Sequence, residues 1–406
     1  MSKHPVAHTD PDAPTDDVAA QLNAAAGKFE RSGDSTLGIE EEFAICDPET
    51  LDLQPRYPEL NAIAEEFGLG TAVAGELLAS EIEFRTGRCE TWADAVTELS
   101  DIRRRVAELA TSTNAVLGAS ATHPWADYRE QPTVQLPYYQ QLVDRMQLVA
   151  RRNNTFGLHV HVGVHGADRA IRVHDALRSL APLMLALSAS SPFLDGLDSG
   201  MASTRSIIFS RQFPRANVAP IFGTMDGYLG HLRWLLDSGA ITSAGQVWWG
   251  TRPHVLHGTV ELRMFDGQPD VRDTLALAAL AQGTVAHLCD LHDANELPEP
   301  IQTVFIDENS WRASRYGTDA VFVDAPGTGQ VPAAEAIGAL IANARAAGTR
   351  RGLGIDAGLD RAQGMLDAGC SAVWQRSLHA ETGSLRDAYG AVVSATMASA
   401  TEPAFS

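Results

Sequence analysis

The sequence predicts an α+β fold in which an antiparallel sheet with one polar, concave face is packed by helices. Four short segments alternate apolar and polar residues with a period of two, which is typical of half-buried strands. Longer segments between them have helical periodicity, and the two kinds of segment do not alternate regularly. This order argues against a parallel sheet built from strand–helix–strand repeats.

The composition is that of a globular protein with a sizeable core. Of the 406 residues, 45% are hydrophobic and 20% are charged. The formal net charge of −20 repels nucleic acid and anionic membranes, so we expect neither as a partner. The N-terminus has no apolar signal-peptide core and the chain has no membrane-length apolar run, which predicts a cytoplasmic protein. The four cysteines form no CxxC pair, which argues against a disulfide framework or a zinc site.

The chain divides into a tail and one folded unit. Residues 1–34 are expected to be a largely disordered acidic tail, apart from a short helix near Val18–Phe29, and residues 35–400 a single catalytic domain. A Gly/Ser/Pro-rich region at Ser190–Pro220 reads as a long ordered loop and a candidate lid. Helices are expected at Trp92–Leu117, Arg169–Leu187, Thr274–Leu291, Ala333–Ala347, Asp356–Leu366 and Leu385–Met397.

The first predicted strand, Leu37–Ile45, carries two acids on one face. Successive side chains of a strand point to opposite faces, so Glu40 and Glu42 share the polar face. Two carboxylates about 7 Å apart on one strand face repel each other unless a cation lies between them. Glu41 falls on the apolar face, where it needs an edge position or a partner.

Two further strands extend the polar face. In Ser80–Thr86 the side chains of Glu81, Glu83 and Arg85 share one face, and Glu76 precedes the strand closely enough to reach the same end. In Leu158–Val164 the aliphatic residues form one face, and His159 and His161 occupy the other.

The fourth strand, Thr259–Asp266, puts Glu261 and Arg263 on the face opposite its aliphatic residues. Together the four strands suggest a sheet whose polar face is a concave, water-containing site. Many carboxylates with little sulfur favour hard cations, so we expect Mg²⁺ or Mn²⁺ there.

Arginines complete a candidate phosphoryl-transfer site. The chain has no P-loop and no dinucleotide-binding glycine motif, so bound ATP would be held by metals and arginines. Arg263 neighbours Glu261 on one strand face, Arg205 lies in the Gly/Ser/Pro-rich region, and Arg252 follows a pair of tryptophans. Planar guanidinium groups suit phosphate and carboxylate oxygens, which makes all three catalytic candidates.

In chain order, the motifs GIEEEF, EFRTG, ATHP, GLHVHVGV, ALSASSPF, TRPH, TVELR and NSWRASRYG resemble those of the carboxylate–amine ligases called glutamate–cysteine ligase type 2. The resemblance covers about residues 36–398. It implies a glutamine-synthetase-like fold and ATP-dependent activation of a carboxylate as an acyl phosphate, which an amine then attacks. One departure is Gly250, which stands where the family commonly has an acidic residue.

The resemblance also assigns residues. The metal-binding positions of the more distant bacterial glutamate–cysteine ligases match Glu40, Glu42, Glu76, Glu83 and His159, and their phosphate-contacting arginine matches Arg263. A glutamate two residues before that arginine matches Glu261, which we take as a further metal ligand. We take Arg263, Glu261 and His161 as cofactor-binding residues.

The sequence therefore predicts an ATP-dependent ligase that joins a carboxylic acid such as glutamate to an amine such as cysteine, giving γ-glutamylcysteine in that case. A homodimer would suit a sheet of this kind with a free edge. One alternative is a metal-dependent hydrolase that uses His159 and His161 with carboxylates. Another is a non-catalytic binding protein that retains the fold. Consumption of ATP distinguishes the ligase from the hydrolase and from the non-catalytic binding protein.

Overall fold

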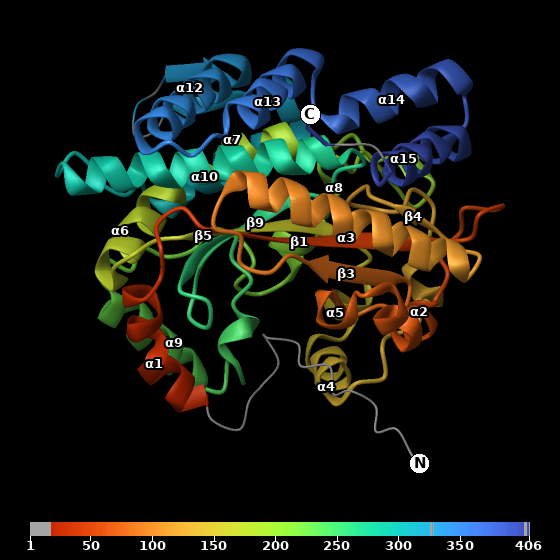
Figure 1. The fold of residues 1–406 in the computed structure, drawn as a ribbon, viewed down its shortest axis with the longest axis horizontal. Helices are drawn as coiled ribbons and strands as arrows, with labels where there is room; N and C mark the ends of the chain where they lie inside the picture. Colours follow the sequence, from red (N-terminus) through yellow and green to blue (C-terminus); the bar gives the residue numbers. More distant parts are fainter. Residues whose placement is uncertain (1–17, 325–326, 328, 402–403, 406) are drawn as a thin grey trace.

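The computed structural model describes residues 18–324, 327, 329–401 and 404–405. These residues build a seven-stranded antiparallel sheet in the order β2-β3-β1-β5-β9-β8, with β4 pairing β1 beyond the end of β5 (Figure 1). All four predicted strands are present and adjacent at its centre. The strands are β1 Leu37–Cys46, β2 Val73–Ala74, β3 Glu81–Arg85, β4 Val116–Gly118, β5 Gly157–Gly163, β8 Thr251–His254 and β9 Thr259–Asp266.

Helices cover the apolar face of this sheet. In Figure 1 the long helix α10 (Val271–Asp293) crosses the sheet, and α12 (Ala333–Arg351) and α13 (Asp356–Ala368) form a further layer beyond it. The other helices on that side are α3 Trp92–Ser112, α6 Ala167–Leu177, α7 Ala181–Ser188, α14 Ser371–Thr382 and α15 Leu385–Ser399. The remaining helices of more than one turn are α1 Val18–Glu30, α2 Tyr57–Ile63, α4 Pro137–Met146, α5 Leu148–Arg151, α8 Thr204–Gln212, α9 Met225–Asp237 and α11 Thr303–Tyr316. Two small hairpins complete the fold: β6 Phe193–Leu194 with β7 Leu197–Asp198, and β10 Val321–Asp324 with β11 Gly329–Pro332.

Two predicted helices differ from what periodicity alone suggests: one ends early and the other is divided into two. The helix expected at Trp92–Leu117 stops at Ser112, because Asn114 adopts a left-handed conformation (φ 56°) and the chain then enters β4. The helix expected at Arg169–Leu187 is divided into α6 and α7. Pro182 lies in the first turn of α7, where its missing N–H is tolerated, whereas it would break a continuous helix.

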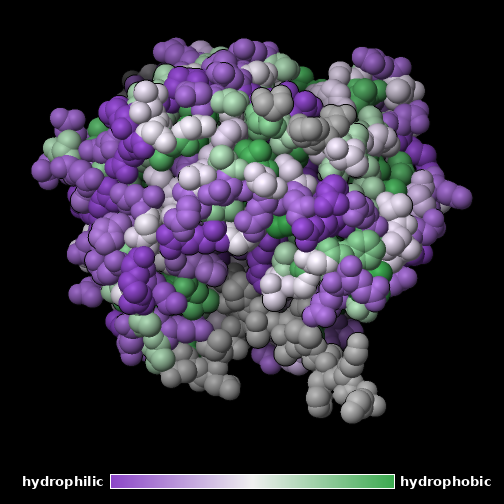
Figure 2. Space-filling view, viewed as in Figure 1, coloured by the Kyte–Doolittle hydropathy of each residue, from purple (hydrophilic) through white to green (hydrophobic). Residues whose placement is uncertain are grey.

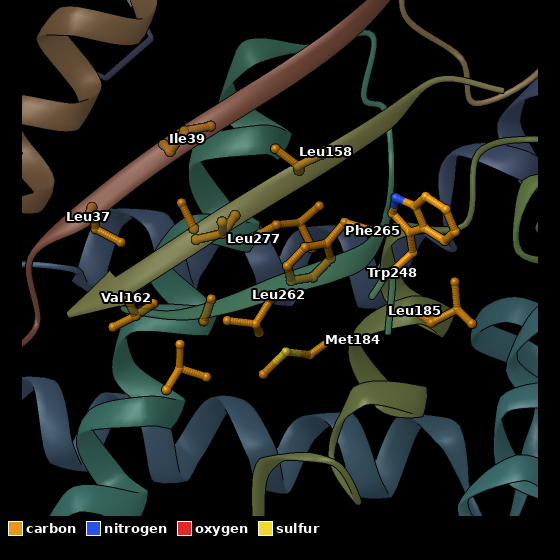
Figure 3. Packing of buried hydrophobic residues seen from close by; sticks show 14 of the residues in the cluster. Leu37, Ile39, Leu158, Val162, Met184, Leu185, Trp248, Leu262, Phe265 and Leu277 are labelled. Carbon is orange, nitrogen blue, oxygen red and sulfur yellow. The ribbon is translucent and has the colours of Figure 1, made fainter. Parts of the chain in front are cut away.

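The core forms where the aliphatic face of the strands meets the helices. Figure 3 shows Ile39 of β1, Leu158 of β5 and Leu262 of β9 on the same side as Met184 of α7 and Leu277 of α10. All five are fully buried, and each such side chain contributes about 1.5–3 kcal/mol of hydrophobic stabilisation. By contrast, hydrophilic residues cover most of the surface seen in Figure 2. By length and composition α10 could cross a membrane, but 83% of its most apolar window is buried inside this core.

The folded structure begins before residue 35, the boundary expected from the sequence. The helix predicted near Val18–Phe29 is present as α1, and it buries Leu22, Ala25 and Phe29 in the main core. Its end is fixed by Glu30, whose carboxylate accepts a hydrogen bond from the backbone N–H of Ala167. Residues 18–34 therefore belong to the packed structure. Residues 1–17 of the expected tail lie outside the described residues.

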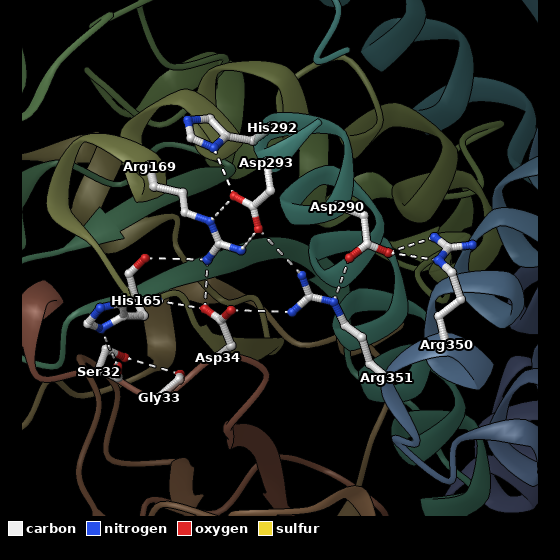
Figure 4. A network of polar contacts seen from close by, with 10 residues as sticks. All are labelled: Ser32, Gly33, Asp34, His165, Arg169, Asp290, His292, Asp293, Arg350 and Arg351. Carbon is white, nitrogen blue, oxygen red and sulfur yellow. Dashed lines mark hydrogen bonds and ion pairs between the residues drawn. The ribbon is translucent and has the colours of Figure 1, made fainter. Parts of the chain in front are cut away.

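An ionic network fixes the entry into β1 (Figure 4). Asp34 accepts hydrogen bonds from the backbone N–H of His165 (2.8 Å) and from Arg169 (2.8 Å), and it pairs with Arg351 (3.3 Å). Asp290 and Asp293 of α10 extend the network through further arginine pairs. Since Asp34 precedes β1 and His165 follows β5, the network joins the ends of these two strands.

Glu41, the acid on the apolar face of β1, is paired with Arg103 of α3. Two hydrogen bonds join the pair, from Nε to Oε2 (2.7 Å) and from Nη2 to Oε1 (2.5 Å), and both residues are 1% exposed. Thr274 donates to the same carboxylate, and Arg103 also donates to the carbonyl oxygens of Gln268 and Pro269. A buried charge pair is tolerated only when its remaining donors and acceptors are satisfied, and here they are.

We expect Arg103→Met to destabilise the fold by about 3–5 kcal/mol, because it leaves the Glu41 carboxylate charged and buried without its partner. Arg104→Met on the same helix is the matched control, because the ion pairs of Arg104 with Asp101 and Glu108 are solvent-exposed and worth about 1 kcal/mol or less. Urea unfolding of the two variants measures the difference. Equal losses of stability in both would show that the buried pair does not hold β1.

Candidate active site

Strand pairing brings the predicted polar residues onto one face. Glu40 lies opposite His159 on one side and Arg85 on the other, and Glu42 lies opposite Glu83. His161 lies opposite Glu261. Residues opposite each other in antiparallel strands project to the same face of the sheet. The period-two pattern therefore gave the shared face of these residues, although an irregularity in the β5–β9 pairing places Phe265 rather than Met264 in the core at the end of β9.

These side chains line an open cavity on the polar face of the sheet. One part of its wall is acidic and basic, with residues Glu40, Glu42, Glu76, Glu81, Glu83, Arg85, His159, Arg205, Arg252 and Arg263. Another part is aromatic, with residues Tyr138, Tyr139, Phe209, Phe213 and Trp248. The cavity therefore combines charge with flat apolar surface.

Glu42, Glu76 and Glu83 form the first of two acidic clusters found among the described residues. One carboxylate oxygen from each lies within 4.8 Å of the others. Burial, together with the charges of Glu40 and Glu76, raises the pKa of Glu83 well above its ordinary value. Three carboxylates this close repel one another, and a hard divalent cation that prefers oxygen ligands removes that repulsion. The donor set fits Mg²⁺ or Mn²⁺.

The second cluster consists of Glu40, His159 and Glu261, whose ligand atoms also lie within 4.8 Å of one another. His159 Nδ1 is 3.1 Å from Glu40, and His161 Nε2 is 3.4 Å from it. Although burial raises it, these two histidines hold the pKa of Glu40 well below its ordinary value. Glu40 is therefore a carboxylate at neutral pH, as a metal ligand must be.

Glu261 is the most constrained member of this cluster. It is fully buried and pairs with both Arg252 Nε and Arg263 Nη1 at 2.5 Å. Burial raises its pKa, but these arginines, Arg252 first, hold the pKa well below the ordinary value. A cation at the second cluster would share Glu261 with two guanidinium groups. The first cluster is thus the freer donor set for a metal.

The three candidate arginines differ in their surroundings. Arg252 is 2% exposed, and it donates hydrogen bonds to Glu261 and to the carbonyl oxygens of Gly245 and Val247. This geometry favours positioning of Glu261 over direct contact with substrate. Arg263 lines the cavity beside the same carboxylate.

Arg205 reaches the cavity from α8, in the predicted long loop. Its Nη2 donates to the carbonyl oxygen of Arg263 (3.3 Å), and its Nε has no hydrogen-bond partner in the described part of the chain. Asp266, at the end of β9, accepts hydrogen bonds from Ser190 N–H, Ser191 Oγ and Ser203 Oγ at 2.8–2.9 Å. These bonds fix the start of α8. A Cβ at position 157 would collide with the Arg205 guanidinium, so the close approach of Arg205 to β5 requires Gly157.

His161 is placed differently from the prediction. It is 5% exposed and does not line the cavity; Nδ1 contacts the hydroxyl of Thr259 (3.0 Å), and Nε2 faces Glu40 and Glu261. It therefore supports the two acids from behind, and the geometry does not favour direct contact with a cofactor. Glu261, also predicted to bind the cofactor, likewise lies behind the cavity wall.

Sequence reasoning missed the aromatic wall and the full role of Glu81. Phe213 and Trp248 pack edge to face with ring centroids 5.6 Å apart, and they come from loops separated by over 30 residues, so no periodic pattern links them. Glu81 was placed on the polar face but not assigned to the site. It lines the cavity, and burial and then Glu42 and Glu83 raise its pKa well above the ordinary value.

Solved structures with this fold include two ligases. A glutamate–cysteine ligase from Francisella tularensis, in complex with AMP, superposes with a TM-score of 0.65 at 12% identity, covering 91% of this chain and 89% of that one. A bifunctional glutathione synthetase from Pasteurella multocida gives a TM-score of 0.65 at 13% identity, covering 95% of this chain but only 55% of that one. The chain thus shares its fold with these two ligases.

The sequence identifies the family within this class. Residues 36–391 match the profile of glutamate-cysteine ligase family 2 (GCS2), and the chain belongs to that family. A relative from Thermobifida fusca, provisionally named glutamate–cysteine ligase 2, is 38% identical over 90% of this chain and 92% of its own length. Another from Rubrobacter xylanophilus, provisionally named glutamate–cysteine ligase 2-2, is 37% identical over 87% of this chain and 89% of its own.

We expect Glu83→Gln to stabilise the metal-free protein and to weaken its response to Mg²⁺. Because the folded-state pKa of Glu83 is raised, the unfolded chain loses this proton first, and stability falls as pH rises above the ordinary glutamate value. The neutral variant lacks that loss, so its thermal unfolding temperature should exceed that of the wild type at neutral pH, and the gap should close in acid.

The control is Glu66→Gln, which removes one exposed carboxylate outside the cavity. Thermal unfolding is measured from pH 4 to pH 8 with EDTA and with excess Mg²⁺. A metal-dependent rise in unfolding temperature that is as large in Glu83→Gln as in the control would remove the first cluster as a metal site.

Proposed function

We propose that this chain is an ATP-dependent carboxylate–amine ligase, with glutamate and cysteine as the leading substrate pair and γ-glutamylcysteine as their product. One observation carries the proposal. Two three-ligand acidic clusters and four arginines converge on one cavity of a chain that belongs to a glutamate–cysteine ligase family. Small-molecule substrates suit a concave site whose wall combines charged and aromatic side chains. We further propose a cytoplasmic location, where ATP is available.

Divalent cations fit the cavity by donor chemistry. Glu42, Glu76 and Glu83 would hold one ion, and Glu40, His159 and Glu261 would hold another, with Mg²⁺ or Mn²⁺ favoured by the oxygen-rich donors. When bound, such ions neutralise negative charge on the phosphates during phosphoryl transfer.

The chain's own arginines supply the remaining positive charge. We assign Arg263 to the transferred phosphoryl group, because it lines the cavity beside the second cluster, and Arg205 to the same group or to the substrate carboxylate. Both side chains are anchored, Arg263 by Glu261 and Arg205 by Asp266 and the Arg263 carbonyl. Anchored donors lose little freedom when the reaction develops charge, and that lowers the barrier.

The aromatic wall gives the cavity an apolar half. Phe209 and Phe213 lie 5.0 Å apart between ring centroids, and Phe213 continues to Trp248. We assign this surface to the nucleoside base, since a flat aromatic heterocycle gains both burial and stacking there. The same wall would exclude water from the activated carboxylate until the amine arrives.

The test is phosphate release from ATP by the purified protein with Mg²⁺, across pairs of carboxylic acids and amines, with products identified by mass spectrometry. We expect release that requires both substrates and yields one amide product. We expect Glu42→Gln to lower turnover by about 100-fold or more, on the scale of losing one key electrostatic group, whereas Glu66→Gln leaves it unchanged.

Each other outcome points elsewhere. Amide formation from a different pair keeps the mechanism and reassigns the substrates. Hydrolysis of a substrate without ATP would replace the proposal with a metal-dependent hydrolase. Full ATP-dependent activity in Glu42→Gln would overturn the assignment of the first cluster.

A further inference from the structure

Glu81 of β3 is a buried carboxylate that lacks a hydrogen-bond donor. Its side chain is 2% exposed and lines the active-site cavity. Within the described part of the chain its carboxylate accepts no hydrogen bond and forms no ion pair, and it meets other charges only at a distance. Burying a carboxylate in this state is costly unless a ligand supplies the donors.

A metal ion shared with the first cluster does not account for Glu81. Glu81 and Glu83 project from the same face of β3, but they are two residues, or about 7 Å, apart along the strand. The residue opposite Glu83 on β1 is Glu42, whereas the residue opposite Glu81 is Ala44. Glu81 belongs to neither of the acidic clusters found among the described residues. The donors that it needs must therefore come from another kind of ligand.

Arg205 places a complementary charge near Glu81 without contacting it. Burial, and then the charges of Glu42 and Glu83, raise the pKa of Glu81, whereas the charge of Arg205 lowers it. Arg205 is itself 5% exposed. Its Nη1 lies 3.9 Å from Asp266, and its Nε has no hydrogen-bond partner in the described residues. The cavity thus presents a buried carboxylate and a buried guanidinium, and both retain hydrogen-bonding capacity.

These two groups match the head group of an α-amino acid. An ammonium group donates charged hydrogen bonds to a carboxylate, and a guanidinium donates parallel hydrogen bonds to a carboxylate. Because one carbon separates the two charges of such a head group, Glu81 and Arg205 can each bind one of them without touching each other. An ammonium beside Glu81 would also offset the repulsion from Glu42 and Glu83.

We propose that Glu81 determines specificity for the carboxylic acid substrate by binding its α-ammonium group, while Arg205 binds its α-carboxylate. This inference rests on the proposed ligase function. The amine of the second substrate cannot take this place, because it must lose its proton and attack the activated carboxylate. With its head group held at Glu81, the acid substrate would direct its side-chain carboxylate toward the first cluster, about 7 Å along β3. Glu81 would thereby decide which of the two carboxylates is activated.

The test uses Glu81→Gln, which keeps the size of the side chain and removes its charge, with Glu66→Gln as the control. Titration calorimetry, with Mg²⁺ and a non-hydrolysable ATP analogue, compares L-glutamate with glutarate, which has the same carbon chain and both carboxylates but no ammonium group. We expect the wild type and the control to bind glutamate about 30-fold more tightly than glutarate, the scale of a hydrogen bond between charged groups. In Glu81→Gln the affinity for glutamate should fall by a similar factor, whereas the affinity for glutarate should stay the same or rise.

Three results would overturn the assignment. The first is glutamate binding as tight in Glu81→Gln as in the wild type. The second is a wild type that does not prefer glutamate to glutarate, which needs no variant to fold. The third is a smaller rise in unfolding temperature with Mg²⁺ in Glu81→Gln than in Glu66→Gln, which would make Glu81 a metal ligand. None of these measurements depends on turnover, so they are distinct from a failure of ATP-dependent phosphate release, which would overturn the ligase itself.

Discussion

Carboxylates on the polar face of the sheet repel one another, and much of the architecture around them offsets that repulsion. Glu40, Glu42, Glu81 and Glu83 project from two adjacent strands into one cavity, and Glu76 joins them from a loop. Burial strengthens the effect because water no longer screens the charges. The histidines of β5 stabilise the charge on Glu40, and the arginines of β8 and β9 stabilise that on Glu261. The ion-pair contacts of the Glu42 cluster are longer, from His159 Nε2 to Glu42 (3.7 Å) and from Arg85 to Glu83 (3.8 Å). That difference is the physical reason to place a divalent cation there.

The opposite side of β1 shows how the same kind of charge is handled when no ligand is needed. Glu41 stands between two site acids in sequence, but it points into the core and meets a complete set of donors from Arg103 and Thr274. The Glu41 carboxylate has all its hydrogen-bond partners within the core, whereas the acidic clusters on the other face of the strand border a cavity. One strand thus carries both a carboxylate paired in the core and carboxylates of the candidate site, and strand alternation decides which face each one takes.

Much of the site could be predicted because strand periodicity is strict. The alternation in β1, β3, β5 and β9 gave the face of Glu40, Glu83, His159 and Arg263. Glu76 lies on no regular element, and its short distance in sequence from β3 placed it at the same end. The side-chain contacts could not be predicted. A strand pattern does not show that Arg252 donates its hydrogen bonds to Glu261 or that His161 lies behind the cavity wall. The aromatic wall was not predicted because its residues come from helices and loops that only tertiary packing brings together.

The central strand of the sheet is also the first to be made. As the chain is synthesised, β1 precedes its neighbours β3 and β5, and the second acidic cluster lacks Glu261 until β9 is made. Arg103 finds its last partner, Ser399, only when the final helix is in place. The candidate site therefore needs residues from Glu40 to Arg263, and the buried pair behind it is completed only by a contact between the two ends of the sequence. A nascent chain stopped before α10 would hold every strand of the sheet but expose much of their apolar face, and it would depend on its cellular surroundings to keep it from misassembly.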